Sequence, residues 1–346
     1  MHSSRWIIFL MAIALGCGIL MQAGCRLPWG QEPPPAPTPV KDKSLPAYAC
    51  PLDGSPAGMQ DISRRPLAVM VENSPDARPQ SGLTKACVVY EAITEGGITR
   101  FLAVFLHGNP AVIGPVRSAR PHFINIEREY DAAYVHCGES YEALQILSLD
   151  PSIRNLDQMK YPRPFWRDHT RRAPHNLYTS SAKLRTFLTL SGWGGQPVSL
   201  PNFTSSDRLK SGQPAHTIDI HIPGAVHYRL RMVYDKKLGG YQRYMDGKLH
   251  VDRETQQPVV AKNVIFQRVY AAPFVSSDKG TFDVEVVGSG EGEFMSGGFQ
   301  ESLLWQKTNI YTITSFTDTH GQSLPFRPGQ TWVEVLPADS VVTVIN

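Results

Sequence analysis

Residues 95–121 decide how this chain folds. They begin with EGGITR (95–100), continue with the apolar run FLAVFL (101–106) and end with GPVRSARP (114–121). The apolar run predicts a strand in a sheet that is buried on both faces. Glycines and prolines on either side of it favour tight bends. No Asp or Glu occurs from residue 96 to residue 126, so the three arginines in this stretch must find anions elsewhere.

The surrounding residues, from 64 to about 195, alternate between strand-like and helix-like segments. Short apolar runs predict strands over 66–71, 88–90 and 132–136. Helices are predicted over Ser118–Tyr130, Ser140–Leu149 and Ser180–Leu190, with Ser118 and Ser180 as N-caps. The pattern predicts a mixed α/β domain around a central sheet, over residues 61–200.

From about residue 216 the pattern changes to short alternating runs. Tyr228, Leu230, Met232 and Tyr234 occupy every second position, which is typical of a half-buried strand. Glycine pairs and clusters predict turns at 239–240, 246–247, 288–292, 297–298 and 320–321. We therefore expect an all-β domain over 215–346, joined to the first domain by a linker at 196–214. The predicted fold class is α+β.

The N-terminus indicates export and anchoring. Arg5 precedes an apolar stretch over 6–21, which has the length of a signal-peptide core. Residues 21–25, MQAGC, resemble the site where bacterial lipoproteins are cut before a cysteine that receives diacylglycerol. We expect a signal peptide over 1–24, membrane attachment through lipidated Cys25, and an extended proline-rich tether over 25–60. The expected location is extracytoplasmic.

Composition and cysteine count exclude several classes of protein. The net charge of +3, with 19% charged residues, is too small for a nucleic-acid-binding protein. Behind Cys25, three cysteines remain: Cys50, Cys87 and Cys137. They allow at most one disulfide, in three possible pairings, or three buried thiols. No C-x-x-C spacing occurs, which argues against zinc ribbons and thioredoxin-like chemistry. His136, His175 and Glu95 could contribute to a metal site, but no ligand spacing supports one, so we expect no metal and no cofactor.

Several long motifs occur in an order that resembles the DUF3048, or YerB-like, lipoprotein family. The motifs in the first half are VENSPDARPQSGL (71–83), YE (90–91), EGGITRF (95–101), GPVRSAR (114–120) and APHNLY (173–178). Those in the second half are YQR (241–243), Gly247, Asp252, KNV (262–264) and GQTW (329–332). The resemblance implies a two-domain bacterial surface lipoprotein, and it supplies no established catalytic residue.

Function must therefore be argued from the polar residues of these motifs, most of which follow predicted strands. In open α/β sheets, ligand crevices form at strand ends. The first hypothesis is an arginine-lined cleft that binds an anionic wall component, such as a polymer phosphate or a peptidoglycan carboxylate. Its candidate binding residues are Arg78, Arg100, Arg117, Arg120, Arg171, Arg172 and Asn176, with His175 closing the pocket. The alternative, left open, is that Glu72, Glu91 and Glu95 pair with these arginines internally.

The second hypothesis is a hydrolase or lyase that acts on peptidoglycan. Glu95 and Glu72 would form the carboxylate pair, one of them kept protonated, with His136 or His175 as the proton carrier. Cys137 beside His136 is a weaker nucleophile candidate, because neighbours on a strand face opposite sides. The third hypothesis is a non-catalytic partner of another envelope protein. Trp305 and Trp332 are expected in the core rather than in a sugar platform.

Overall fold

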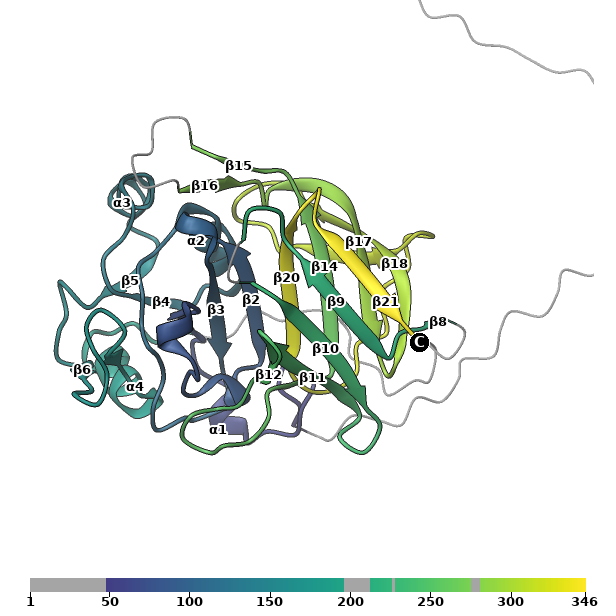
Figure 1. Ribbon diagram of the computed structural model, residues 1–346. Coiled ribbons are helices and arrows are strands. Elements are labelled where there is room, and N and C mark those ends of the chain that lie inside the picture. The colour runs from purple at the N-terminus through teal and green to yellow at the C-terminus, as the bar shows by residue number, and fades with distance from the viewer. Residues whose placement is uncertain (1–47, 196–211, 226–227, 275–280) are drawn as a thin grey trace, which may run out of the picture. The chain divides into compact units, whose positions relative to one another are not determined.

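The computed structural model describes residues 48–195, 212–225, 228–274 and 281–346 (Figure 1). The signal peptide, Cys25, the tether up to residue 47 and most of the predicted linker lie outside these residues. Within the described ranges, none of the helices combines the length and the apolar character that crossing a bilayer requires.

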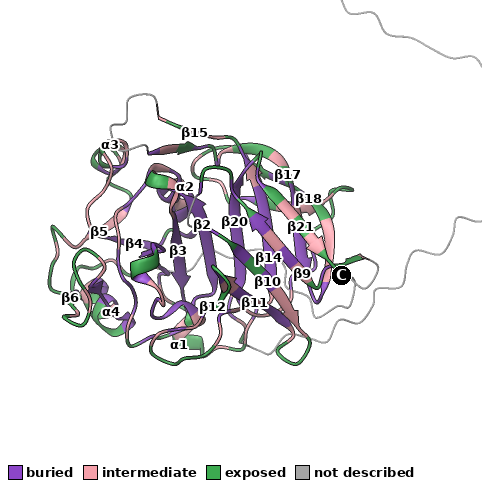
Figure 2. Ribbon diagram, viewed as in Figure 1, coloured by how far each residue is buried: buried purple, intermediate pink, exposed green. Residues whose placement is uncertain are grey.

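One large mixed sheet runs through the molecule and explains the buried apolar runs. Across the sheet its strands are β19 (Ser315–Asp318), β18 (Phe299–Lys307), β17 (Gly288–Ser296), β14 (Asn263–Val269), β20 (Thr331–Pro337), β2 (Val88–Ile93), β3 (Thr99–Phe105), β1 (Leu67–Glu72), β4 (Ala133–His136) and β5 (Arg154–Asp157). A short strand, β8 (Gln213–Pro214), pairs with β18. Every residue of β1, β2, β3 and β20 is buried, so the prediction of a sheet covered on both faces is confirmed (Figure 2).

The two halves of the sequence share this sheet. Strand β2 pairs in parallel with β20, with Val88 opposite Thr331, and β20 pairs in parallel with β14. The α+β class is confirmed, and the described residues after Trp193 form strands and loops only. The division into one domain over 61–200 and another over 215–346 stays a prediction. Strands from both ranges are hydrogen-bonded to one another in the large sheet.

A second sheet of six strands comes entirely from the later half. Its order is β12 (Lys248–Leu249), β11 (Gly240–Met245), β10 (Leu230–Asp235), β9 (Thr217–His221) and β21 (Val341–Ile345), with β13 (Val260–Ala261) beside β11. The predicted turn at 246–247 is confirmed: Asp246 and Gly247 have φ angles of 51° and 77°. Two small hairpins pair β15 (Ala271–Pro273) with β16 (Phe282–Val284) and β6 (Trp166–Arg167) with β7 (Leu177–Tyr178).

Within the described residues, the helices belong to the first half. They are α1 (Met59–Ile62), α2 (Pro121–Glu127), α3 (Tyr141–Leu149) and α4 (Ser181–Leu190), together with the 3-10 turns η1 (Pro75–Ala77), η2 (Leu83–Lys85), η3 (Glu95–Gly97) and η4 (Arg128–Tyr130). Ser180 caps α4 as predicted, and Ser140 caps α3, since their hydroxyls accept the amides of Lys183 and Ala143. The cap at Ser118 is wrong, because α2 begins at Pro121 and proline holds the preceding residue in an extended conformation.

Two further expectations need correction. Residues 288–292 are not a turn but the start of β17. A Cβ on Gly292 would lie 2.0 Å from the Phe266 carbonyl oxygen, so this glycine permits close approach of strands rather than a bend. The tether does not extend to residue 60, because Cys50 and Leu52 are buried and Ala49 pairs with Pro56. Trp305 and Trp332 lie in the core, as expected.

Candidate functional site

Four strands of the first half end at the same edge of the large sheet. Strand β1 is parallel to β4, and β4 is parallel to β5. Strands β1 and β2 are both antiparallel to β3, so they too run in one direction. The polar residues that end or follow these strands, Glu72, Glu95, His136 and Asp157, therefore lie along one edge. We call it the carboxyl edge, and such edges are where open sheets bind ligands.

The turn between β2 and β3 points Glu95 at two arginines. Gly96 and Gly97 both have φ of 67°, and a Cβ on Gly97 would lie 2.5 Å from the Gly224 carbonyl oxygen, so both the bend and its packing require glycine. The Nε of Arg120 donates to one Glu95 oxygen at 2.9 Å, and Arg100 binds the other. Burial opposes ionisation of Glu95, but Arg100 and Arg120 outweigh it and lower the pKa to about 2.

Arg117 joins this pair of arginines, although the three are separated in sequence. Burial and the positive charges of Arg120 and Arg117 lower the pKa of Arg100 to about 10, despite the attraction of Glu95. Burial, Arg120 and Arg100 lower the pKa of the neighbouring His122 to about 3. The sequence hypothesis required these arginines to converge, and the structure brings them together. It also pairs two of them with Glu95, as the internal-pairing alternative expected.

Glu72 organises a second group of side chains on the same edge. Its Oε1 atom accepts the Ser74 hydroxyl at 2.9 Å and lies 2.9 Å from Nδ1 of His175. The Nε of Arg117 approaches the same oxygen at 3.2 Å, without hydrogen-bond geometry. Because Glu72 occupies Nδ1, the other ring nitrogen of His175 faces away from it, 3.9 Å from the exposed carboxylate of Asp76.

The remaining candidate residues are not hydrogen-bonded to Glu95 or Glu72 in the described part of the chain and have other partners. Arg78 donates to the Asn73 carbonyl at 2.9 Å and binds Asp246. Arg171 donates to the carbonyls of Ala77 and Pro79 and so fixes the loop that carries His175. In the same loop Arg172 is exposed, and Asn176 accepts Nη1 of Arg167 at 2.7 Å.

The surroundings of His136 and Cys137 do not suit either residue for catalysis. The two ring nitrogens of His136 lie 2.8 Å from the Gly138 carbonyl and 2.6 Å from Asn155, and the ring is fully buried. It therefore has no nitrogen available to carry protons or to bind a metal with Glu139 and Asp157, although these three residues lie close together. Burial and Asp157 raise the pKa of Cys137, which disfavours a thiolate nucleophile.

Sequence reasoning missed Ser74 as a member of the Glu72 group. The signal that could have found it is a hydroxyl two residues after a carboxylate that ends a buried strand. At that spacing the chain turns at η1, so the two side chains can meet.

Comparisons with known proteins agree over nearly all of the folded chain. The family model described as "Protein of unknown function (DUF3048) N-terminal domain" matches residues 52–193, and the model of the C-terminal domain matches residues 218–333. A Bacillus subtilis (strain 168) protein named "Putative lipoprotein YerB" is 33% identical over 293 residues, which cover 83% of this chain and 86% of that protein. The crystal structure of YerB from Bacillus subtilis superposes with a TM-score of 0.76 at 31% identity, covering 86% of this chain and 99% of that one.

Proposed function

Because the chain belongs to the DUF3048 family, whose Bacillus subtilis relative is named as a lipoprotein, we propose that it is a lipid-anchored, extracytoplasmic protein. We further propose that its carboxyl edge binds an anionic group of the cell wall. The ligand chemistry is a phosphate or carboxylate oxygen, which guanidinium groups bind with two parallel hydrogen bonds.

The observation that carries this proposal is the charge balance of the edge. Three guanidiniums, those of Arg100, Arg117 and Arg120, share the carboxylates of Glu95 and Glu72. Arg117 is the half-buried member, with a side chain 27% exposed. Among the described residues its acidic contact is Glu72, whose Oε1 atom is also hydrogen-bonded to Ser74 and His175. Arg117 therefore keeps donors for a ligand.

This assignment changes the roles given to two arginines by the sequence. Arg120 uses Nε, Nη1 and Nη2 on Glu95 and on the Ala119 carbonyl. Arg100 binds Glu95 and the Ser118 carbonyl. Both hold the two flanking segments together and supply positive charge, whereas Arg117 and the outer nitrogen of His175 face the ligand.

Binding to purified wall material tests the proposal. Full-length protein is mixed with sedimentable wall that carries its anionic polymer and with the same wall stripped of polymer phosphate. We expect Arg117→Gln to weaken binding by at least about tenfold, as expected for the loss of a charge-assisted contact. Arg231→Gln is the matched control, because Arg231 forms a solvent-exposed ion pair with Asp219. Equal binding by wild type and Arg117→Gln contradicts the proposal, and the stripped wall distinguishes phosphate from carboxylate.

A second candidate function is hydrolysis of wall peptide or glycan, and one contact favours it. A buried carboxylate that holds Nδ1 of a histidine orients the opposite nitrogen as a general base, and Glu72 and His175 have this arrangement. Glu95 does not fit the protonated acid of the original hypothesis, since its pKa is lowered to about 2.

Release of soluble fragments from purified sacculi tests this second candidate. Loss of release in His175→Gln, with release retained in His169→Gln, supports it. His169 is an exposed histidine in the same loop and is a suitable control. Absence of release by the wild-type protein eliminates the enzymatic candidate and leaves the binding proposal standing.

A further inference from the structure

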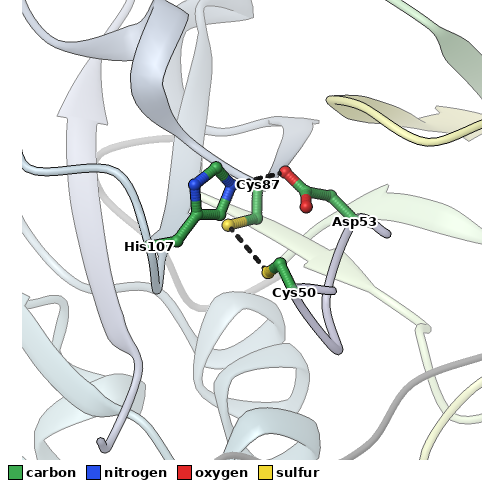
Figure 3. A group of neighbouring side chains, drawn as sticks. All are labelled: Cys50, Asp53, Cys87 and His107. Atoms are coloured by element: carbon green, nitrogen blue, oxygen red, sulfur yellow. Dashed lines mark hydrogen bonds and ion pairs between the residues drawn. The ribbon is translucent and has the colours of Figure 1, made fainter. Parts of the chain in front are cut away.

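Four metal-binding side chains meet at the end of the β2–β3 hairpin opposite the Glu95 turn. They are Cys50, Asp53, Cys87 and His107 (Figure 3). Cys87 directly precedes β2, and His107 lies two residues after β3. Cys50 and Asp53 come from one turn, closed by a 2.8 Å hydrogen bond from the Gly54 amide to the Cys50 carbonyl. One ligand atom from each residue lies within 4.8 Å of all the others.

The sulfur separation fits a shared metal ion. The Sγ atoms of Cys50 and Cys87 are 3.8 Å apart, whereas a disulfide needs about 2.05 Å. Two sulfurs bound to one zinc at about 2.3 Å, at a tetrahedral angle, are separated by roughly 3.8 Å. On the other side of the group, Nε2 of His107 and Oδ2 of Asp53 are 2.9 Å apart. Small movements of the last two side chains complete a tetrahedron.

The chemistry and burial of the group also match zinc. Two thiolates, one imidazole and one carboxylate form a mixed donor set that suits Zn²⁺ and disfavours Mg²⁺ and Ca²⁺, which prefer oxygen ligands. Cys50, Asp53 and Cys87 are all at most 3% exposed, and His107 closes the group toward solvent. Four protein ligands in a closed setting are typical of structural zinc rather than catalytic zinc.

Neighbouring hydrogen bonds already fix the ligands. The Leu52 amide points at the Cys50 sulfur at 3.4 Å, and the Ser55 amide donates to Oδ1 of Asp53 at 3.0 Å, which leaves Oδ2 for the metal. The backbone of Asp53 also accepts the Gly329 amide at 2.7 Å, just before β20. Such outer contacts orient metal ligands and raise affinity.

We propose that Cys50, Asp53, Cys87 and His107 bind one structural Zn²⁺ ion. On binding, the two thiols release their protons, and the proton that Nε2 of His107 donates to Asp53 is released to solvent or transferred to Nδ1, so that Nε2 can donate its lone pair to the metal. The metal joins the turn that carries Cys50 and Asp53 to the start of β2 and the end of β3. The proposal departs from the sequence-based expectation of no metal, because the ligands come from three segments and the two cysteines are 37 residues apart.

The test uses the full-length protein, purified in detergent under anaerobic reducing conditions. With Co²⁺ as the probe, we expect the charge-transfer and visible bands of tetrahedral thiolate coordination in the wild type. After loading with Zn²⁺ and gel filtration, elemental analysis should find one zinc per chain. Cys87→Ser and His107→Ala should weaken binding by more than about 100-fold, since they remove ligands rather than outer partners. Cys137→Ser, which changes a cysteine outside the group, should keep the zinc.

The cobalt spectrum of the wild-type protein can overturn the proposal by itself, because that measurement does not require any variant to fold. Reduced protein that shows no thiolate bands and retains no zinc contradicts it. Peptide mapping of protein taken from its native membrane that finds Cys50 linked to Cys87 by a disulfide contradicts it as well. Chelation that lowers the melting temperature of the wild type, but not that of Cys87→Ser, supports the structural role.

Discussion

Two arginine–glutamate clusters, one buried and one at the carboxyl edge, differ in stoichiometry. In the buried cluster, Arg243 of β11 binds Glu91 of β2 and lies 3.7 Å from Glu334 of β20. In the edge cluster, three arginines share two glutamates. Glu91 lies inside β2, and Glu95 lies four residues later, in the turn that follows.

This difference in stoichiometry indicates which cluster stabilises the fold and which one is available to a partner. The three side chains of the buried cluster are at most 2% exposed, and the Arg243 guanidinium lies over the rings of Phe101 and Trp332, at 5.3 and 4.5 Å from their centres. Two carboxylates face one guanidinium in this cluster. Burial raises the pKa of Glu334 to about 7, although the positive charge of Arg243 acts to lower it. No positive charge remains there for a ligand, whereas the edge cluster has one guanidinium in excess.

The largest expected effect comes from breaking the buried cluster. Arg243→Met leaves Glu91 buried without its charged partner and should lower the free energy of unfolding by about 3–5 kcal/mol. Urea unfolding at pH 7 measures it. The double variant Arg243→Met with Glu91→Gln is the control, because it removes both charges and should recover part of the loss. A single variant as stable as the wild type contradicts the structural role.

A smaller effect is expected from Glu95, and it depends on pH. Because its folded pKa is lowered from 4.5 to about 2, Glu95 contributes stability that is fully present above pH 4.5 and is lost as the pH falls toward 2. Glu95→Gln should therefore lower the free energy of unfolding by about 3 kcal/mol at pH 7. The gap between wild type and variant should close between about pH 4.5 and pH 2, as measured by unfolding curves at several pH values. A gap that does not change with pH rejects the ionised pairing.

The smallest effect on stability is expected from Arg117. Its side chain is partly exposed, so Arg117→Ala should change the free energy of unfolding by about 1 kcal/mol or less. The same variant should lose wall binding, which separates recognition from folding. Arg231→Ala, in an exposed ion pair with Asp219, should change neither stability nor binding measurably. A large loss of stability in Arg117→Ala would place this arginine with Arg243 instead.

Local signals in the sequence were sufficient for much of the first half. The runs that became β1, β3 and β4 are apolar because both faces of the sheet are covered, and Ser140 and Ser180 carry the capping hydroxyls of α3 and α4. The prediction that Ser118 caps a helix was wrong, because Pro121 holds Arg120 in an extended conformation and the helix begins only at Pro121. The prediction of a turn at 288–292 was wrong, because a glycine that permits two strands to approach closely cannot be distinguished in the sequence from a glycine that forms a turn.

Non-local contacts account for the rest. The parallel pairing of β2 with β20 joins residues more than 240 positions apart, and no periodicity indicates it. The convergence of Arg100, Arg117 and Arg120 could be anticipated, because the stretch around them lacks acidic residues. Internal pairing with Glu72, Glu91 or Glu95 was one of the two alternatives, but the sequence could not decide which arginine binds which glutamate, since that depends on how the turn at Gly96 and Gly97 is oriented.

The position of β20 has a consequence for the order in which the protein can assemble. This strand fills the gap between β2 and β14, yet its residues, 331–337, follow both of those strands in the sequence. Until those residues leave the ribosome, β2 and β14 each present an unpaired side, and partner strands with exposed edges are prone to wrong associations. The central sheet therefore closes only after residues 331–337 have been made, and a chain truncated before residue 331 lacks the strand that joins its two halves.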